Sequence, residues 1–272
     1  MSGECSHNCE SCGVDCAQRQ GPSSLLEPVN ELSRIHKVIA VVSGKGGVGK
    51  SMVTSLLAVS AARAGKAVGV LDADITGPSI PTAFGVHGRP YGTEKGMPAL
   101  VSRDGIKVMS INLLLDNETD PVVWRGPVIA SAVKQFWTDV IWGELDVLFV
   151  DMPPGTGDVP LTVFQSLPVS GVVVVTTPQD LVGMIVEKAV NMAKMMNVPV
   201  LGLVENMAWY ECPCCGQKLS IFGQSHVEEQ GLRLGIGNTV SLPLDPTLAA
   251  ACDSGKAEDV DTSALWEFSQ KL

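Results

Sequence analysis

Val38-Ile-Ala-Val-Val-Ser43 runs directly into Gly44-Lys-Gly-Gly-Val-Gly-Lys-Ser51, and this junction decides the fold. The first six residues are mostly apolar and β-branched, as in a buried strand, and the next eight fit the phosphate-binding pattern G-x-x-x-x-G-K-[S/T]. A run from Met52 to Ala64 without a helix breaker follows and predicts a helix. Strand, loop and helix therefore follow one another in the order that a phosphate-binding loop requires.

The composition of this loop predicts that it binds a nucleotide. Its glycines let the backbone curl so that successive N–H groups point at one anion, and the start of the helix adds its positive dipole end. We expect Lys50 to reach the β- and γ-phosphates and the Ser51 hydroxyl to ligate Mg²⁺. The residues expected to contact the nucleotide here are Gly44, Lys45, Gly46, Gly47, Val48, Gly49, Lys50, Ser51 and Met52.

A second lysine, Lys45, lies inside the loop, where an ordinary phosphate-binding loop does not need one. In this respect the loop resembles the deviant loop of the dimerising ATPases that include MinD, ParA and the nitrogenase iron protein. The resemblance implies that Lys45 crosses a dimer interface and contacts the nucleotide of the partner. A solvated surface lysine is the alternative, because lysines are mostly exposed.

The overall composition indicates a folded, acidic, cytoplasmic protein. The chain has 272 residues, of which 45% are hydrophobic, and such a chain can bury the core of one α/β domain. Its net charge of -10 and its lack of a basic run argue against nucleic acid or an anionic membrane as partners. We expect neither a signal peptide nor a membrane span. In the reducing cytosol, the eight cysteines then indicate metal ligands or redox thiols.

Carboxylates follow two further apolar runs that we predict to be strands. Ala67–Leu71 leads into Asp72 and Asp74, and Val147–Val150 leads into Asp151. Ligands of open α/β sheets bind at the carboxyl ends of the strands. We therefore expect Asp72 and Asp151 to hold Mg²⁺ through water and Asp74 to orient or activate the attacking water. For Asp72 and Asp74, a loop or helix-cap role is the alternative.

Three further segments complete the prediction for the nucleotide site. The turn after Asp151 contains two prolines and Gly155, and a backbone N–H of this turn is expected to sense the γ-phosphate. Asp158 is expected to cap the following helix. Asn206 follows the strand predicted over Val198–Val204 and has the donor and acceptor needed to pair with adenine, although it would serve equally to cap a loop. A helix is also predicted from Pro127 to about Trp142.

The first residues of the chain form a cysteine-rich arm. Cys5, Cys9, Cys12 and Cys16 lie among small and polar residues that cannot form a core. This spacing suits a [4Fe–4S] cluster, while four thiolates, with His7 as a substitute, would also satisfy Zn²⁺, and a disordered thiol tail is a third possibility. We predict an arm and linker over residues 1–34 and an ATPase domain over residues 35–272.

A second cysteine motif, Cys212-Pro-Cys-Cys215, follows Asn206. The pair Cys212 and Cys215 supplies half of a four-thiolate site. A redox pair is the alternative, although the predicted strand and proline-containing loop lack the helix N-terminus that lowers the pKa of a redox cysteine. In a two-fold dimer, two such pairs meet on the axis and supply the four thiolates of one [4Fe–4S] cluster. Cys214 is expected to point away from the pair.

Taken together, these motifs resemble the Mrp/ApbC family of iron–sulfur cluster carrier ATPases. The resemblance is carried by Gly44–Ser51, Asp72–Ser79, Trp124–Pro127, Asp151–Asp158, Glu205–Met207 and Cys212–Cys215. The cysteine arm resembles that of the cytosolic scaffold branch, although its spacing is tighter, which leaves open which of its four cysteines are ligands.

The resemblance implies a doubly wound α/β fold of the SIMIBI type of P-loop NTPases, a mostly parallel sheet with helices on both faces. It also implies a homodimer or a heterodimer of paralogues, slow ATP hydrolysis, and a labile [4Fe–4S] cluster that bridges the two subunits and passes to apoproteins. Lys45, Lys50, Ser51, Asp74 and Asp151 would carry the nucleotide chemistry, and Cys212 and Cys215 the cluster. The rival interpretations are a regulatory ATPase of the MinD/ParA type without a cluster, and a structural zinc protein with an ATP-driven switch.

Overall fold

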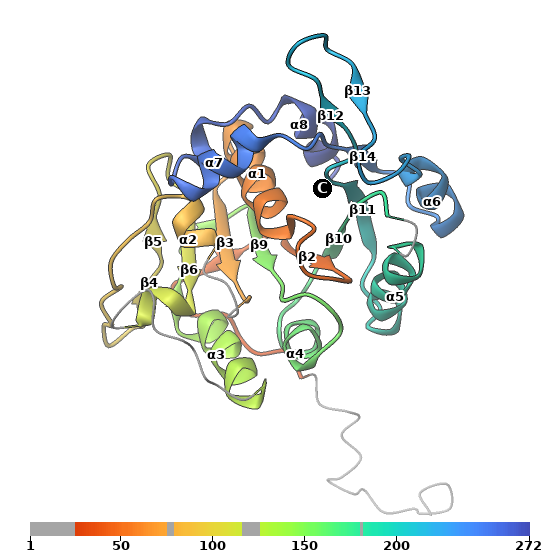
Figure 1. The fold of residues 1–272 in the computed structure, drawn as a ribbon. Coiled ribbons are helices and arrows are strands. Elements are labelled where there is room, and N and C mark those ends of the chain that lie inside the picture. The colour runs from red at the N-terminus through yellow and green to blue at the C-terminus, as the bar shows by residue number, and fades with distance from the viewer. Residues whose placement is uncertain (1–24, 75–78, 116–125, 180–181) are drawn as a thin grey trace, which may run out of the picture.

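The computed structural model describes residues 25–74, 79–115, 126–179 and 182–272. At its centre lies an eight-stranded sheet in the order β14-β11-β10-β2-β9-β3-β6-β5, in which β5 alone among these eight runs antiparallel to its neighbour (Figure 1). The strands are β2 (Val38–Ser43), β3 (Val68–Asp72), β5 (Leu100–Val101), β6 (Lys107–Ser110), β9 (Val147–Asp151), β10 (Gly171–Thr176), β11 (Val200–Glu205) and β14 (Thr239–Ser241). The predicted doubly wound, mostly parallel sheet is confirmed.

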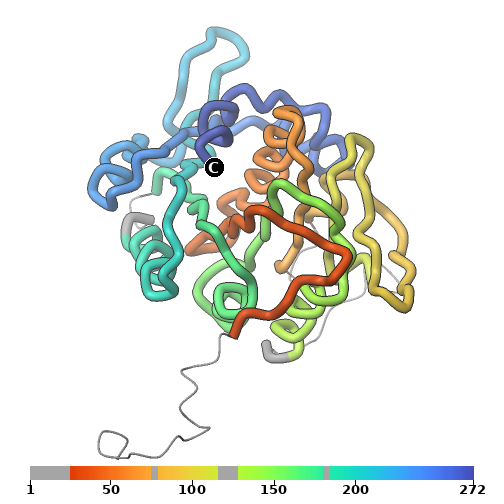
Figure 2. The backbone as a smooth tube through the Cα atoms, turned by 180° about the vertical axis from the view of Figure 1, so that it is seen from behind, coloured from red at the N-terminus to blue at the C-terminus, as the bar shows by residue number. Residues whose placement is uncertain are grey.

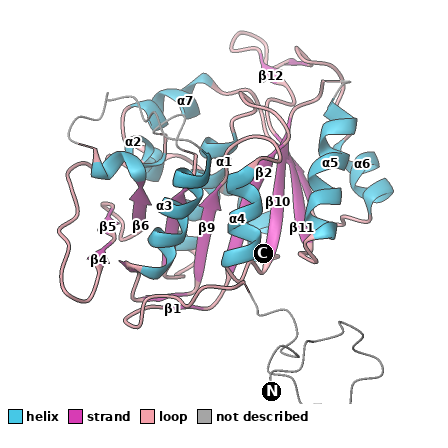
Figure 3. Ribbon diagram, turned by 90° about the horizontal axis from the view of Figure 1, so that it is seen from below, coloured by secondary structure: helices cyan, strands magenta, loops and turns pink. Residues whose placement is uncertain are grey.

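Helices cover both faces of this sheet (Figures 1 and 3). One face carries α1 (Lys50–Arg63), α2 (Ile80–Ala83), α7 (Pro246–Asp253) and α8 (Ser263–Gln270). The other carries α3 (Gly126–Thr138), α4 (Asp158–Ser166), α5 (Val182–Met195) and α6 (Val227–Leu234). Two short 3₁₀ helices, Ile111–Leu114 and Ala257–Asp259, complete the described helical segments.

The alternation of side chains along β2 explains why the sheet has two cores. Every residue of β2 is buried. Successive side chains point to opposite faces, so Val38, Ala40 and Val42 pack against α3 to α6, whereas Ile39 and Val41 pack against α1, α2 and α8. Because both faces are covered, the central strands are continuous apolar runs.

Three short strand pairs lie outside the main sheet: β1 (Arg34–Ile35) with β8 (Glu144–Leu145), β4 (Met97–Pro98) with β7 (Val140–Ile141), and β12 (Tyr210–Glu211) with β13 (Lys218–Leu219). The helix predicted to reach Trp142 ends at Thr138 instead. Val140 and Ile141 pair with Met97 and Pro98, and the fully buried Trp142 ring donates to the Phe136 carbonyl at 3.1 Å. Strand pairing and burial override the helical pattern there.

The segment Leu25–Arg34, which we assigned to the arm and linker, packs on the ATPase domain. Figure 2 shows it, in red, crossing the back of the molecule. The Glu27 N–H donates to the Ser166 carbonyl at 2.8 Å, and the Trp137 ring N–H donates to the Glu27 carbonyl at 2.9 Å. Folded backbone is therefore present before residue 35. The four arm cysteines, Cys5, Cys9, Cys12 and Cys16, lie outside the described residues.

Across the described ranges, the helices are too short or too polar for any of them to cross a membrane.

Candidate functional site

The carboxyl ends of three adjacent strands form the centre of the candidate site. β9 lies between β2 and β3, and Asp151 is in register with Val41 on one side and with Asp72 on the other. The strand order changes direction here, because the chain passes from β2 to β3 on one side and from β9 to β10 on the other. Crevices at such switch points bind ligands in open α/β sheets.

The phosphate-binding loop has the left-handed turns that its glycines were expected to permit. Gly47 and Gly49 both have φ of 78°, and Gly49 is the residue that precedes α1. The Ser43 hydroxyl donates to the Lys45 carbonyl at 3.0 Å and fixes the start of the loop. The loop backbone is therefore curled, with α1 beginning at Lys50.

Four residues selected from the sequence meet in one buried cluster behind this loop. The Lys50 Nζ lies 2.8 Å from Asp151 Oδ1 and 3.5 Å from Asp74 Oδ2. The Ser51 hydroxyl donates to Asp151 Oδ2 at 2.5 Å. The side chains of Lys50, Asp74 and Asp151 are 6%, 13% and 0% exposed, so these charges interact with little solvent screening.

Asp72, the remaining carboxylate of this edge, is buried beside the cluster. Ser110 donates to Asp72 Oδ2 at 3.1 Å, and the Asp74 N–H donates to Asp72 Oδ1, also at 3.1 Å. Burial, followed by the charge of Asp151, raises the pKa of Asp72 well above its ordinary value of 3.8. The charged form of Asp72 is therefore disfavoured in the structure.

The turn that follows Asp151 differs from the prediction in two details. The Gly155 N–H donates to the Ser43 carbonyl at 2.9 Å, so in this arrangement it is committed to the base of the loop. Gly157 is the residue before α4, and Asp158 is the first residue of the helix, so the prediction that Asp158 caps it was wrong by one position. As a carboxylate in the first turn, Asp158 still interacts favourably with the helix dipole.

Asn206 lies beneath the loop and does not present an edge to solvent. It is fully buried, and its Nδ2 donates to the Val48 carbonyl at 2.9 Å. A Cβ atom on Gly49 would lie 2.3 Å from this Nδ2 atom, so the close contact requires glycine at position 49. The Oδ1 atom of Asn206 has no hydrogen-bond partner. An acceptor without a partner is rare in a buried position.

Lys45, the second lysine of the loop, contacts its own chain. Its Nζ donates to the Oε1 atom of Gln179, which follows β10. Gln179 is exposed, and the Lys45 head group lies at the surface of the loop.

The cysteine motif forms the tip of a hairpin between β12 and β13. Cys212 is half-buried, and Cys214 and Cys215 are exposed. The Cys212 N–H donates to the Gln217 carbonyl at 2.9 Å, and hydrogen bonds from the backbone of Cys214 and Cys215 lower the pKa of the Cys212 thiol below its ordinary value of 9.0. The side chains of Cys215 and, to a smaller extent, Cys214 lower the pKa of Cys212 in the same direction.

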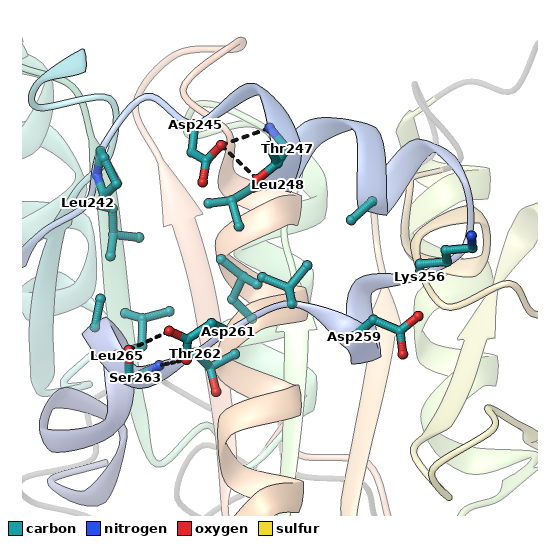
Figure 4. A pocket seen from close by; sticks show the side chains of 15 residues that line it. Leu242, Asp245, Thr247, Leu248, Lys256, Asp259, Asp261, Thr262, Ser263 and Leu265 are labelled. Carbon is teal, nitrogen blue, oxygen red and sulfur yellow. Dashed lines mark hydrogen bonds between the residues drawn. The ribbon is translucent and has the colours of Figure 1, made fainter. Parts of the chain in front are cut away.

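Two cavities flank α1. A cavity of about 440 Å³ adjoins the loop and is lined in part by Gly49, Ser51, Met52, Met207 and Cys252. A second, of about 470 Å³, lies under α7 (Figure 4). Its lining includes Leu56, Leu248 and Leu265, with Lys256 and Asp259 at one end, and contains none of the residues selected from the sequence.

Comparison with known protein families identifies the family to which this chain belongs. The model of the NUBPL iron-transfer P-loop NTPases, a ParA-type family, matches residues 34–271. The chain belongs to this family. As a member of the NUBPL family it is a P-loop NTPase, which agrees with the loop, the sheet and the buried cluster described above.

Named relatives support the assignment to the NUBPL family. The iron-sulfur cluster carrier protein of Clostridium perfringens is 45% identical over 267 residues, which cover 93% of this chain and 94% of the relative. The carrier protein of the same name from Methanocaldococcus jannaschii is 46% identical over 82% of this chain and 78% of its own length. The mouse iron-sulfur cluster transfer protein NUBPL is 44% identical over 82% of this chain and 70% of its own length.

Solved structures agree with this fold. A nucleotide-binding protein from Archaeoglobus fulgidus, solved in complex with ADP, is 46% identical, covers 84% of this chain and 89% of its own, and has a TM-score of 0.76. MinD of Pyrococcus horikoshii, solved with Mg-ADP, covers 88% of this chain and 95% of its own with a TM-score of 0.56, but it is only 18% identical and shows the fold alone.

In this NUBPL-family chain, the sequence analysis missed several residues that support the site. Thr54 donates to Asp151 Oδ1 at 2.8 Å, and Ser110 and Gln179 contact Asp72 and Lys45 as described. Thr54 lies one helical turn after Lys50, so the helical period alone places both on one face. The other two contacts depend on which strands are neighbours, which no local pattern reveals.

Proposed function

We propose that this chain is an ATP-dependent iron–sulfur cluster carrier of the cytoplasm that holds a [4Fe–4S] cluster between two copies of itself and delivers it to apoproteins. The observation that carries this proposal is that the short segment after β11 connects the two sites. Asn206 follows the end of β11 and contacts the phosphate loop, and Cys212 lies six positions further along the chain. A nucleotide at the loop and a cluster at the hairpin would thus share one short backbone segment.

The residues at the loop fit Mg²⁺-ATP. The curled backbone of Gly44–Ser51 offers N–H groups to phosphate oxygens, and Ser51 and Asp151 offer the hard oxygen atoms that Mg²⁺ prefers. We retain Asn206 as the adenine contact, and its buried Oδ1 atom, which has no hydrogen-bond partner in this structure, would have to become accessible to the exocyclic amine. Bound Mg²⁺-ATP supplies the phosphoryl group that is hydrolysed.

Individual side chains then have separate roles in hydrolysis. Lys50 stabilises the charge on the phosphate oxygens, and Asp74, 3.5 Å from its Nζ, orients the attacking water. Asp151 accepts hydrogen bonds from Ser51 and Thr54, which hold it in place for a water-mediated Mg²⁺ contact. Lys45 exchanges Gln179 for the nucleotide of the partner when two copies associate.

The cluster, which is the cargo of the reaction, binds at the hairpin. Backbone N–H groups stabilise the Cys212 thiolate, and thiolates are the form in which cysteine ligates iron. One hairpin supplies the Cys212 and Cys215 pair, so two copies together complete a four-thiolate site. A shift of the two subunits after hydrolysis separates the pairs and releases the cluster to an apoprotein.

The proposed function also includes a partner chain and a second metal site in the cysteine-rich arm. The partner is a second copy of this chain or a paralogue, and the net charge of -10 argues against nucleic acid or an anionic membrane. We further propose that Cys5, Cys9, Cys12 and Cys16 hold a second [4Fe–4S] cluster, with zinc as the competing occupant.

Anaerobic reconstitution tests the cluster site. A variant with the four arm cysteines changed to serine isolates the hairpin, and it should bind about four iron and four sulfide ions per dimer and turn brown. Adding Cys212→Ala and Cys215→Ala should remove this iron, whereas the matched control Cys214→Ala should retain it. Full iron binding after loss of Cys212 and Cys215, or zinc alone in protein purified without oxygen, would contradict the proposal.

A further inference from the structure

Met207 lies between the phosphate loop and the cysteine hairpin. β11 ends at Glu205, Asn206 contacts the loop, and the first hairpin strand begins at Tyr210. The backbone between the two sites therefore consists of Met207, Ala208 and Trp209.

The backbone of Met207 is held in a left-handed conformation, with φ of 58°. Among the described residues other than glycine, only Asn197 shares a positive φ. This conformation is unfavourable for a residue with a Cβ atom and persists where the surroundings impose it. Both neighbours of Met207 are anchored: the Asn206 N–H donates to the Thr176 carbonyl and the Ala208 N–H to the Leu242 carbonyl, each at 2.8 Å.

The side chain of Met207 reaches the loop. It is half-buried and lines the cavity of about 440 Å³ together with Ser51 and Met52. Its Cε atom lies 3.6 Å from the position that a Cβ atom on Gly49 would occupy. A group that enters this cavity therefore meets the Met207 side chain.

Beyond Met207, strand pairing and one side-chain contact join the two strands of the hairpin. The Lys218 Nζ lies 4.3 Å from the centroid of the Trp209 ring. Lys218 is on β13 and Trp209 directly precedes β12, so this contact joins the two strands that carry the cysteine loop. The Leu244 N–H, which belongs to the segment after β14, donates to the Trp209 carbonyl at 2.7 Å and anchors the base of the hairpin. A rotation at Met207 would displace Cys212 and Cys215 together.

We propose that Met207 is a positioning residue that couples occupation of the cavity beside Ser51 to the placement of Cys212 and Cys215. The inference rests on the proposed function, because it explains how a nucleotide at the loop changes the exposure of a cluster at the hairpin. Displacement of the Met207 side chain transmits to a backbone conformation that only its surroundings maintain, and the hairpin moves in response.

Site-resolved alkylation of the cluster-free full chain, with Mg-ADP as the probe, tests this coupling. Saturating Mg-ADP should change the iodoacetamide alkylation rates of Cys212 and Cys215 about fivefold in the unmodified chain. Met207→Gly keeps the left-handed backbone and removes the side chain, and it should reduce this response to less than about 1.5-fold. Met207→Leu, which keeps the bulk, should retain most of the response.

Asn197→Gly is the matched control, because Asn197 has φ of 56° but lies at the turn between α5 and β11. It should leave the response unchanged. Cys252, which lines the same cavity, reports occupancy through its own protection in every variant. An unmodified chain without a response, or a Met207→Gly variant that responds fully while Cys252 is protected, would overturn the inference.

The two proposals fail in distinguishable ways. The alkylation assay requires no cluster, so a failure of the carrier function appears as missing iron in reconstitution, whereas a failure of the coupling appears as an unchanged thiol response. Calorimetry with Mg-ADP completes the test. A loss of affinity of more than about tenfold in Met207→Gly would also overturn the inference, because Met207 would then be a ligand contact instead of a coupling residue.

Discussion

The phosphate-loop cluster and the cysteine hairpin follow strands of the same sheet, but they differ in how much of a site one chain supplies. Lys50 and Asp151 are buried and bonded to each other and to neighbouring hydroxyl groups. Cys214 and Cys215 are exposed at a hairpin tip, and in the proposed function the Cys212 and Cys215 pair supplies half of a four-thiolate site. The first region is organised within one chain, whereas in the proposed function the second needs another copy of the chain to complete it. We propose that this difference suits a carrier, because a site shared by two chains opens when the chains separate.

The largest expected effect is at the organised region. Lys50→Ala should reduce ATP hydrolysis at least about 100-fold, because it removes the charge that we propose to stabilise the phosphates. A phosphate-release assay measures this, with the exposed Lys95→Ala as control. Lys50→Arg, which keeps a charge between the buried carboxylates, separates loss of catalysis from loss of folding. Hydrolysis by a folded Lys50→Ala variant within tenfold of the unmodified chain would contradict the assigned role.

The tight packing of the loop against Asn206 can be tested by substituting two glycines, Gly47 and Gly49, that share a φ of 78°. No atom lies within 4 Å of a Cβ on Gly47, so Gly47→Ala should cost only the left-handed conformation, about 1–2 kcal/mol. Gly49→Ala also clashes with the buried Asn206 and should cost about 1–3 kcal/mol more. Urea unfolding of both variants measures the difference, and equal stabilities would show that the contact is not rigid.

Asp72 allows the electrostatics of the same region to be tested by pH. Well below pH 3.8 this carboxyl is protonated in both the folded and the unfolded chain. As the pH rises, the unfolded chain ionises first, so the raised folded pKa makes Asp72 progressively destabilising until its folded pKa is passed. Asp72→Asn should therefore increase the free energy of unfolding at neutral pH, with a gain that shrinks toward pH 4. A gain independent of pH would contradict this explanation.

The smallest expected effect is a difference in the pH dependence of alkylation between two thiols, one in each region. Backbone hydrogen bonds lower the pKa of Cys212, whereas burial raises the pKa of Cys252 beside the loop. Alkylation of Cys212 should therefore reach half of its maximal rate below pH 9 and that of Cys252 above it. Site-resolved mass spectrometry across this range provides the measurement, and coincident profiles would remove the electrostatic distinction between the regions.

The sequence was most informative where chemistry is local. Gly44–Ser51 places its lysine and serine by spacing alone, and the rule that ligands bind at the carboxyl ends of parallel strands brings Asp74 and Asp151 to them. The fold class follows from the same alternation of apolar strands and helices. The assigned roles of these residues stay predictions that the proposed experiments address.

The sequence was least informative where contacts join distant segments. The burial of Asn206 depends on Gly49 approaching it closely, and the partner of Lys45 is Gln179, which follows the neighbouring β10. The helix end at Thr138 depends on pairing between β4 and β7. Each of these features requires the strand order or the tertiary packing, which no window of sequence contains.

The most direct test of the account compares cluster binding with cluster transfer in Lys50→Ala. The variant, loaded with a cluster under anaerobic conditions, is mixed with an apo iron–sulfur protein and ATP, and the activity gained by the recipient is followed. The account predicts an iron content close to that of the unmodified chain and a transfer rate at least about tenfold lower. Unimpaired transfer by a Lys50→Ala variant without measurable ATP hydrolysis would contradict it, because the two regions would then work independently.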